Sequence, residues 1–418
     1  MPARASSGGR VYVKTILSLA LITRLGVVSM VLFCYPRNWL FSKAPDLGFL
    51  AQSLSSGRGL SSPFGGSTGP TAFLAPGYPA LLGLLFRICG SYSFASAVAL
   101  MALQTLFAIV TVALIIHIAG ALFGASTANL AGAFWALSLP LIWLPAIPWE
   151  TSLSILLLTG MVALALRVVS HPRGRLWALI GAYCGLAMLV NPSLALAFFT
   201  ILSWTIHQTR SEWRYEPWIC GLTLLAVFAP WPLRNARVLH AFIPLRSNFG
   251  YELWQGNHPG AMGVFDPTME PLQNKREYDD YAEEGEVAYM AHKTKLAAAY
   301  IQAQPGQFVR LSAKRVTRFW TGAGSRDNSG AIEAHAVVTS LLGLTGLGVL
   351  FKQARCKERA RDHASATLFL LPIVVFPLPY YITHPDFRFR LLLDPLLTIL
   401  SAYAVTQAGS HWMGERKA

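Results

Sequence analysis

The sequence predicts an all-α integral membrane protein with about ten transmembrane helices and one large external loop. Of its 418 residues, 54% are hydrophobic and 13% are charged. A soluble domain carries roughly 25% charged residues, so too few charges remain here to cover a soluble surface. Long apolar runs recur along the whole chain, and basic residues gather in the short connections between them. Both patterns are typical of a multi-pass membrane protein.

The apolar runs give the positions of the spans. A span needs about 20 apolar residues, and several of these runs are near the lower limit. We expect spans at residues 15–34, 95–118, 127–147, 151–169, 176–191, 193–207, 218–232, 335–351, 366–382 and 391–407. The apolar segment 77–90 has about fourteen residues, which is short for ~30 Å of hydrocarbon. We therefore predict that it forms a helix lying at the external surface.

The charges of the connections predict the orientation. With the N-terminus inside, the cytoplasmic connections fall at 119–126, 170–175, 208–217, 352–365 and the C-terminal tail, and all but the first carry basic residues. The basic N-terminus before the first span is then a retained signal-anchor. We expect a multi-pass protein of the cell membrane, in a bacterial inner membrane, with its active site facing the periplasm.

This topology divides the chain into three parts. Residues 1–232 form an N-terminal transmembrane module, in which 35–94 is a first external loop. Residues 233–334 have ordinary soluble composition and form the large external loop. Residues 335–418 supply the C-terminal transmembrane helices and a cytoplasmic tail.

Two classes of site are excluded by charge and cysteine content. The net charge of +14 would suggest nucleic acid in a soluble protein. Here the basic residues follow the positive-inside trend, and no basic groove with interleaved aromatic residues occurs, so we expect membrane lipid and no nucleic acid as a partner. The five cysteines lie far apart and form no CxxC pair. They predict neither a disulfide framework nor a zinc site, and we assign no metal ligand.

Two carboxylates are candidates for catalysis. Asp46 follows the first span in SKAPDLGFLAQSLSSGRGL, where apolar neighbours can raise its pKa toward that of a general base. Arg58 in the same segment is available as a cation. Glu150 lies in LPAIPWETSLSILLL at the external end of a span. The alternatives are a solvated carboxylate at Asp46 and, at Glu150, a cap on the helix that starts near Thr151.

Further candidates stand at the external mouths of other spans. Tyr78 belongs to the rigid turn PGYP, which either starts a helix or lines a site. Arg234 follows PWP and suits phosphate binding, although an interfacial arginine is equally expected there. Asn257 lies in GYELWQGNHPG. The loop THPDFRFRLLLDPLL holds His384, Arg388 and Arg390, and basic residues on the external side indicate an anionic ligand. Its Asp394, inside an apolar run, is costly at membrane depth.

Taken in order, these motifs resemble those of the GT-C membrane glycosyltransferases of glycosyltransferase family 39, which includes protein O-mannosyltransferases and aminoarabinose transferases. The matching pieces are SLSSGRG after Asp46, APGYPALL, WETSLSILL, PWPLRN with GYELWQGNHPGA, and FRFR. Two departures are present, because Leu47 replaces the second acid often found after the first, and the first proline after FRFR is Pro395.

The resemblance implies a GT-C-like helix bundle and transfer of a sugar from a polyprenyl-phosphate donor to a lipid, glycan or protein acceptor. It matches Asp46 and Glu150 to the catalytic acids, and Arg234, Arg388 and Arg390 to basic positions that hold the donor phosphate. Arg58, Tyr78, Asn257 and His384 are expected to line the pocket. The residues predict no cofactor, and the sequence leaves open whether the reaction needs a divalent cation.

Two other classes of function remain. A transporter or flippase for an anionic lipid or glycan would use the same arginines, but the repeat symmetry common in transporters is not evident. An inactive relative acting as an assembly partner would tolerate Asp46→Asn.

Overall fold

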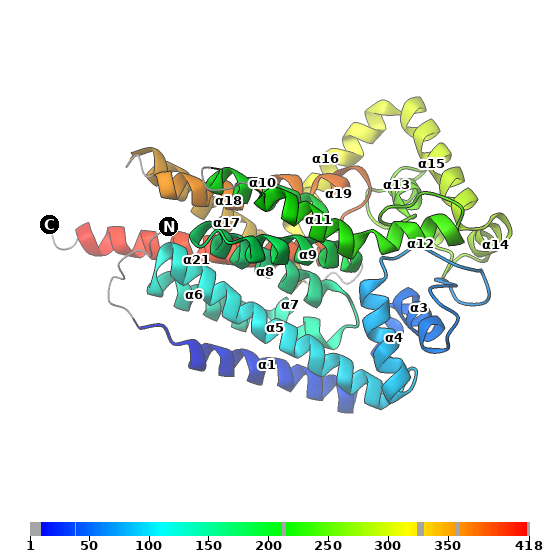
Figure 1. Cartoon of the computed structure of the whole chain (residues 1–418), viewed down its shortest axis with the longest axis horizontal. Coiled ribbons are helices and arrows are strands. Elements are labelled where there is room, and N and C mark those ends of the chain that lie inside the picture. The colour runs from blue at the N-terminus through cyan, green and yellow to red at the C-terminus, as the bar shows by residue number, and fades with distance from the viewer. Residues whose placement is uncertain (1–9, 38, 211–214, 324–329, 357–359, 416–418) are drawn as a thin grey trace.

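The spans form one bundle of roughly parallel helices, and the segments 35–94 and 233–334, which we predict to be external, gather at one end (Figure 1). The computed structural model describes residues 10–37, 39–210, 215–323, 330–356 and 360–415. Within these ranges the elements are helical, apart from one isolated bridge between Ser61 and Pro70. Parts of the predicted cytoplasmic connections, at 211–214, 357–359 and 416–418, lie outside the described residues. The first turns of α1 (Val13–Cys34) and the last turns of α21 (Asp394–Glu415) lie at the opposite end of the bundle (Figure 1).

Seven helical stretches in the described chain are long and apolar enough to cross a bilayer. They are α1 (Val13–Cys34), α5 (Phe94–Phe123), α8 (Thr151–Ser170), α11 with α12 (Glu216–Phe228, Pro230–Val238), α17 (Gly330–Cys356), α18 with α19 (Ala360–Val375, Leu378–Ile382) and α20 with η3 and α21 (Phe387–Arg390, Leu391–Leu393, Asp394–Glu415). A further apolar pair, α6 (Ala125–Leu137) with α7 and η1 (Leu139–Trp143, Leu144–Ala146), is bent by 62° at the break and has the length and composition of a broken span or a re-entrant loop. The predicted all-α membrane class is confirmed.

The other two predicted spans are shorter helices. α9 (Gly174–Val190) has 17 residues and α10 (Leu194–Thr209) has 16. At 1.5 Å per residue each reaches only about 25 Å, less than the hydrocarbon thickness of ~30 Å. Asn191 and Pro192 cause the break, because a proline cannot donate to the helix that precedes it. α9 packs against α11, and α10 packs against α8 and α18.

The segment predicted to lie at the surface is α4 (Gly77–Cys89), which has 13 residues. It runs across the long helices instead of along them and packs against α3 (Pro45–Ser55) (Figure 1). Its first residue fits closely against α9, where a Cβ at Gly77 would stand 2.8 Å from the carbonyl oxygen of Leu189. Glycine thus allows α4 to start against the end of α9.

The large external loop is also helical. It contains α13 (Phe249–Gly256), η2 (Pro267–Met269), α14 (Lys275–Glu284), α15 (Glu286–Ala303) and α16 (Pro305–Thr321). The first external loop adds the short α2 (Trp39–Ser42). Buried Glu286 joins the two loops, because its carboxylate accepts hydrogen bonds from the Thr71 hydroxyl, the Ala72 N–H at 2.7 Å and the Tyr281 hydroxyl at 2.8 Å.

Candidate active site

A cavity of about 100 Å³ lies between the bundle and the external segments. Its wall comes from segments far apart in the sequence: the first external loop with α3 and α4, the start of α8, the end of α9, the large external loop, and the 384–389 turn. Its charged or titratable lining residues are Asp46, Tyr78, Glu150, Arg246, Tyr251, Glu252, Glu270, His384 and Arg388. The structure therefore brings together five of the predicted residues, namely Asp46, Tyr78, Glu150, His384 and Arg388.

Asp46 occupies the first turn of α3. Pro45 starts the helix, and the positive end of the helix dipole favours a carboxylate in that turn. Burial raises the pKa of Asp46 above its usual 3.8, and the charge of Glu150 adds to this rise. The backbone N–H of Leu47 and the charges of Arg388 and Arg246 oppose it. Asp46 thus combines access to the cavity with a raised pKa, as a general base requires.

Glu150 stands at the N-cap position of α8, but its carboxylate makes no capping hydrogen bond to that helix. Glu150 therefore lies at the N-terminus of the helix without a capping hydrogen bond, and its side chain lines the cavity. The turn before it is held by Gln104 of α5, whose amide donates to the carbonyls of Ile147 at 2.8 Å and Pro145 at 3.3 Å. The chain leaves helical geometry at Ile147, and buried Gln104 supplies hydrogen-bond donors to these two carbonyls.

Arg388 lies on the boundary between the cavity and an adjoining apolar groove of about 310 Å³. Most of the groove wall is hydrophobic, including Trp39, Trp143 and Trp149. The Arg388 guanidinium packs over the rings of Trp149 and Phe389, 5.3 and 5.0 Å from their centroids. Arg388 thus lies between the polar cavity and an apolar groove that could hold a hydrocarbon chain.

His384 and Glu252 form a hydrogen-bonded pair in the cavity wall, with His384 Nε2 and a Glu252 carboxylate oxygen 2.6 Å apart. Burial alone would raise the pKa of Glu252, but the hydrogen bond and charge of His384, together with the charges of Arg246 and Arg388, outweigh it, so the pKa lies below its usual 4.5. α13 approaches this loop closely, because a Cβ at Gly256 would overlap the carbonyl of Thr383. The pair fixes the large external loop to the C-terminal spans.

Four predicted residues do not line the cavity: Arg58, Arg234, Asn257 and Arg390. Arg58 is exposed at a separate surface hollow near α3. Arg234 donates to the carbonyls of Thr71 at 2.7 Å and Leu60 at 3.0 Å, so it holds the first external loop. Asn257 is buried and donates to the carbonyls of Leu253 and Ile382, both at 2.8 Å. The hydrogen-bonding groups of Arg234 and Asn257 are thus used in joining segments of the chain.

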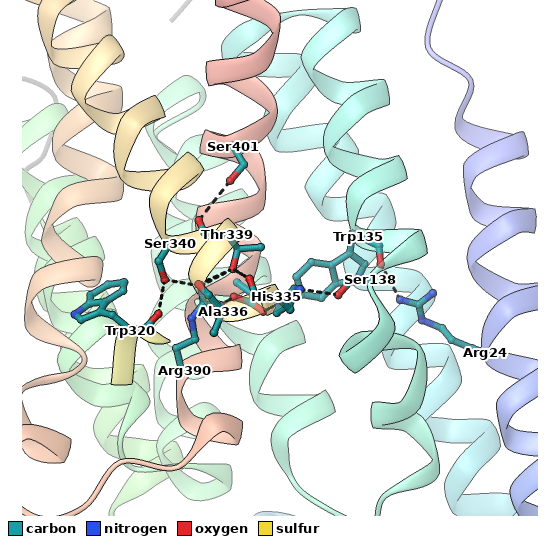
Figure 2. A network of polar contacts seen from close by, with 11 residues as sticks. Arg24, Trp135, Ser138, Trp320, His335, Ala336, Thr339, Ser340, Arg390 and Ser401 are labelled. Atoms are coloured by element: carbon teal, nitrogen blue, oxygen red, sulfur yellow. Dashed lines mark hydrogen bonds and ion pairs between the residues drawn. The ribbon is translucent and has the colours of Figure 1, made fainter. Parts of the chain in front are cut away.

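Arg390 also points away from the cavity, into the bundle (Figure 2). It is ion-paired with Asp394 and donates to Thr339 Oγ1 at 2.6 Å and Ser340 Oγ at 3.0 Å. Asp394 also contacts His335 Nε2 at 2.7 Å. Arg388 and Arg390 are two residues apart in FRFR, and side chains at i and i+2 do not share a helix face. Arg388 therefore faces the cavity, whereas Arg390 is buried in the bundle.

Several cavity residues were not predicted. Arg246, Tyr251, Glu252, Glu270 and Asn191 all line the cavity, and Arg246 Nε also donates to the carbonyl of Phe73 at 3.1 Å. Glu252 lies inside the segment GYELWQGNHPG, where it is the only acid. An acid in a glycine-rich segment was the sequence feature that could have identified Glu252 as a site residue. Arg246 and Glu270 have no local signal, because each lies in an ordinary polar loop. In the part of the chain that the structure describes, no group of three or more His, Cys, Asp or Glu residues could hold a metal ion.

The fold and the cavity define a multi-span membrane protein with a carboxylate- and arginine-lined site at one end of its bundle. Residues 74–233 match the family model described as dolichyl-phosphate-mannose-protein mannosyltransferase. This match confirms the predicted resemblance to membrane glycosyltransferases. It covers Tyr78 and Glu150 but neither Asp46 nor Arg388. A comparison with curated protein sequences gave no match.

Solved structures of two proteins are similar to the chain at low sequence identity. An oligosaccharyltransferase from Archaeoglobus fulgidus, in complex with zinc and sulfate, has a TM-score of 0.47 and 14% identity over 94% of this chain and 49% of its own. ArnT from Cupriavidus metallidurans, bound to undecaprenyl phosphate, has a TM-score of 0.43 and 12% identity over 96% of this chain and 78% of its own. The chain thus spans about half the length of the archaeal enzyme.

Proposed function

We propose that the protein is a membrane glycosyltransferase that moves a sugar from a polyprenyl-phosphate donor to an acceptor hydroxyl. The transfer takes place at the external, periplasmic face of a bacterial inner membrane. The observation that carries this proposal is the place of Arg388, which lines both the carboxylate-bearing cavity and the apolar groove. The family match over residues 74–233 supports the same class of donor.

Each part of such a donor has a counterpart in the site. The groove with its three tryptophans suits an isoprenoid chain, because burial of apolar surface drives its binding. Arg388 suits the phosphate, since a guanidinium pairs with two phosphate oxygens at once. The sugar then lies in the cavity with Asp46 and Glu150, whose carboxylates can accept hydrogen bonds from its hydroxyl groups.

The chemistry follows from these positions. Asp46 removes the proton from the acceptor hydroxyl as the oxygen attacks the anomeric carbon, and its raised pKa brings it closer to the working pH. Glu150 contributes the charge that raises this pKa. Arg388 stabilises the negative charge that develops on the departing phosphate. A phosphate leaving group is already activated, so the reaction needs no nucleotide.

The proposal is tested with purified protein and a labelled polyprenyl-phosphate sugar. Asp46→Asn should keep donor affinity within about twofold and lower transfer by at least about 100-fold, the usual size of a lost general base. Asp279→Asn on α14, an exposed carboxylate paired with Lys275, is the matched control and should transfer normally. Near-normal transfer by Asp46→Asn would remove Asp46 as the base.

The acceptor is found by asking which glycan, lipid or protein loses a sugar in a deletion strain. The transporter alternative gives a different result in reconstituted vesicles. A flippase would move the labelled donor between leaflets without consuming it, and Asp46→Asn would not change that movement.

A further inference from the structure

Trp149 contacts Arg388 and the segment that leads into Asp46, and it precedes Glu150 in the chain. Its indole Nε1–H donates to the carbonyl of Lys43 at 2.9 Å, three residues before Asp46. The guanidinium of Arg388 lies over its ring at 5.3 Å. Glu150 is its neighbour in the chain. The side chain also forms part of the apolar groove, so it lies at the junction of the donor and acceptor regions.

The surroundings hold this tryptophan in place. Its backbone N–H donates to the carbonyl of Ile147 at 2.8 Å, and the same carbonyl accepts a hydrogen bond from Gln104. Gln104 is fully buried in α5, so the turn that carries Trp149 is attached to a long span. A ring supported in this way can fix the groups that rest on it.

Arg388 rests against aromatic faces and lies close enough to Asp386, Glu150 and Asp46 to interact with their charges. Its Nε is buried and has no hydrogen-bond partner among the described residues, while the rings of Trp149 and Phe389 lie beneath its guanidinium. A cation–π contact holds a guanidinium without using its N–H donors, and it strengthens when water is excluded. The donors therefore remain for an anion.

We propose that Trp149 is a positioning residue that sets Arg388 and Asp46 relative to each other, and so aligns the donor phosphate with the base. This inference rests on the proposed function of the site. Its two contacts can be separated by substitution. Trp149→Phe keeps a ring under Arg388 but loses the hydrogen bond to Lys43, whereas Trp149→Ala loses both.

The first experiment needs no ligand. Thermal unfolding of the wild type, Trp149→Ala, Arg388→Ala and the double variant gives a double-mutant cycle for the purified protein. We expect the two losses in Tm to be clearly non-additive, because each substitution removes the same contact. Additive losses would overturn the inference, whatever ligand the protein binds.

The second experiment is a titration with undecaprenyl phosphate. Trp149→Ala should weaken binding about tenfold, and Trp149→Phe should stay within about twofold of the wild type. Trp143→Ala is the matched control, because Trp143 lines the same groove and has no cation–π contact with Arg388 among the described residues. The loss of binding free energy in Trp143→Ala should add to the loss in Arg388→Ala. The losses in Trp149→Ala and Arg388→Ala should not be additive.

These outcomes separate the two proposals. Unchanged affinity in Trp149→Ala, with weakened affinity in Arg388→Ala, overturns the role of Trp149 and leaves the function intact. Absence of saturable undecaprenyl phosphate binding by the wild type overturns the proposed function, and the cycle on Tm then decides the role of Trp149.

The third experiment uses the Phe variant in transfer assays. Because it loses only the contact toward Asp46, kcat should fall about tenfold, the effect of one lost hydrogen bond, while KM for the donor stays unchanged. A kcat equal to that of the wild type would show that Trp149 does not position the base.

Discussion

At the scale of single residues, the charge around Asp46 decides its chemistry. Burial and the charge of Glu150 raise its pKa, while Arg388 and Arg246 act in the opposite direction. The net result is a carboxyl group that binds its proton more tightly than an exposed aspartate. A base of this kind is active only when deprotonated, so transfer should fall as the pH drops through the raised pKa.

Glu150→Gln tests this electrostatic link. The substitution removes a negative charge that raises the pKa of Asp46, so the acid limb of the profile of kcat against pH should move to lower pH. Glu333→Gln, on α17, removes a carboxylate that is not among the charges shifting Asp46 and should leave the limb in place. An acid limb that does not move in Glu150→Gln would mean that Asp46 is not the titrating group.

At the scale of elements, the buried ion pair of Arg390 and Asp394 fixes the turn that presents Arg388. It joins α20 and α21 to α17 through Thr339 and Ser340 (Figure 2). Through His335, which contacts Asp394 and lies 3.2 Å from Ser138 Oγ, the network also reaches the start of α7. Arg390, which the sequence suggested as a phosphate ligand, thus stabilises the helices that carry Arg388.

Breaking one half of this pair should be costly. Arg390→Ala leaves Asp394 buried without its cation and should lower the free energy of unfolding by about 3–5 kcal/mol. Arg390→Met combined with Asp394→Leu removes both charges and should recover most of that loss. Thermal unfolding in detergent measures both variants. A double variant no more stable than Arg390→Ala would contradict this account of the network.

At the scale of the whole molecule, the two external loops close the cavity together. Phe64 and Phe73 of the first loop meet Tyr251 and Tyr281 of the second in one aromatic cluster. Buried Glu286 links the loops through Thr71 and Ala72. The cavity therefore depends on contacts between parts of the chain more than 200 residues apart.

Glu286→Gln should loosen this closure. The amide keeps the shape of the side chain but loses the charged acceptor, at a cost of about 2 kcal/mol. We expect limited proteolysis within residues 60–76 to become faster and the Tm to fall. Glu283→Gln, an exposed neighbour on α14, should change neither. Protease resistance of Glu286→Gln equal to that of the wild type would show that the hydrogen bonds of Glu286 do not hold residues 60–76 in place.

The long apolar helices and the separate short helix at 77–90 could be predicted from the sequence, whereas the runs at 176–191 and 193–207 form helices shorter than a span. A membrane span must satisfy its backbone hydrogen bonds within the segment, so its signal is local in the chain. Asp46, Glu150 and Arg388 could be found because an ionisable group beside an apolar run is costly and conspicuous. The break at Pro192 has an equally local cause.

Only the tertiary structure decided which charged residues meet. Arg388 and Arg390 share one short motif, yet one lines the cavity and the other enters the bundle. Arg234 looked like a phosphate ligand and instead holds a loop. Glu252 and Arg246 join the cavity through the packing of α13 and its preceding loop. A side chain's partner depends on how distant elements pack, and no local pattern of residues records that arrangement.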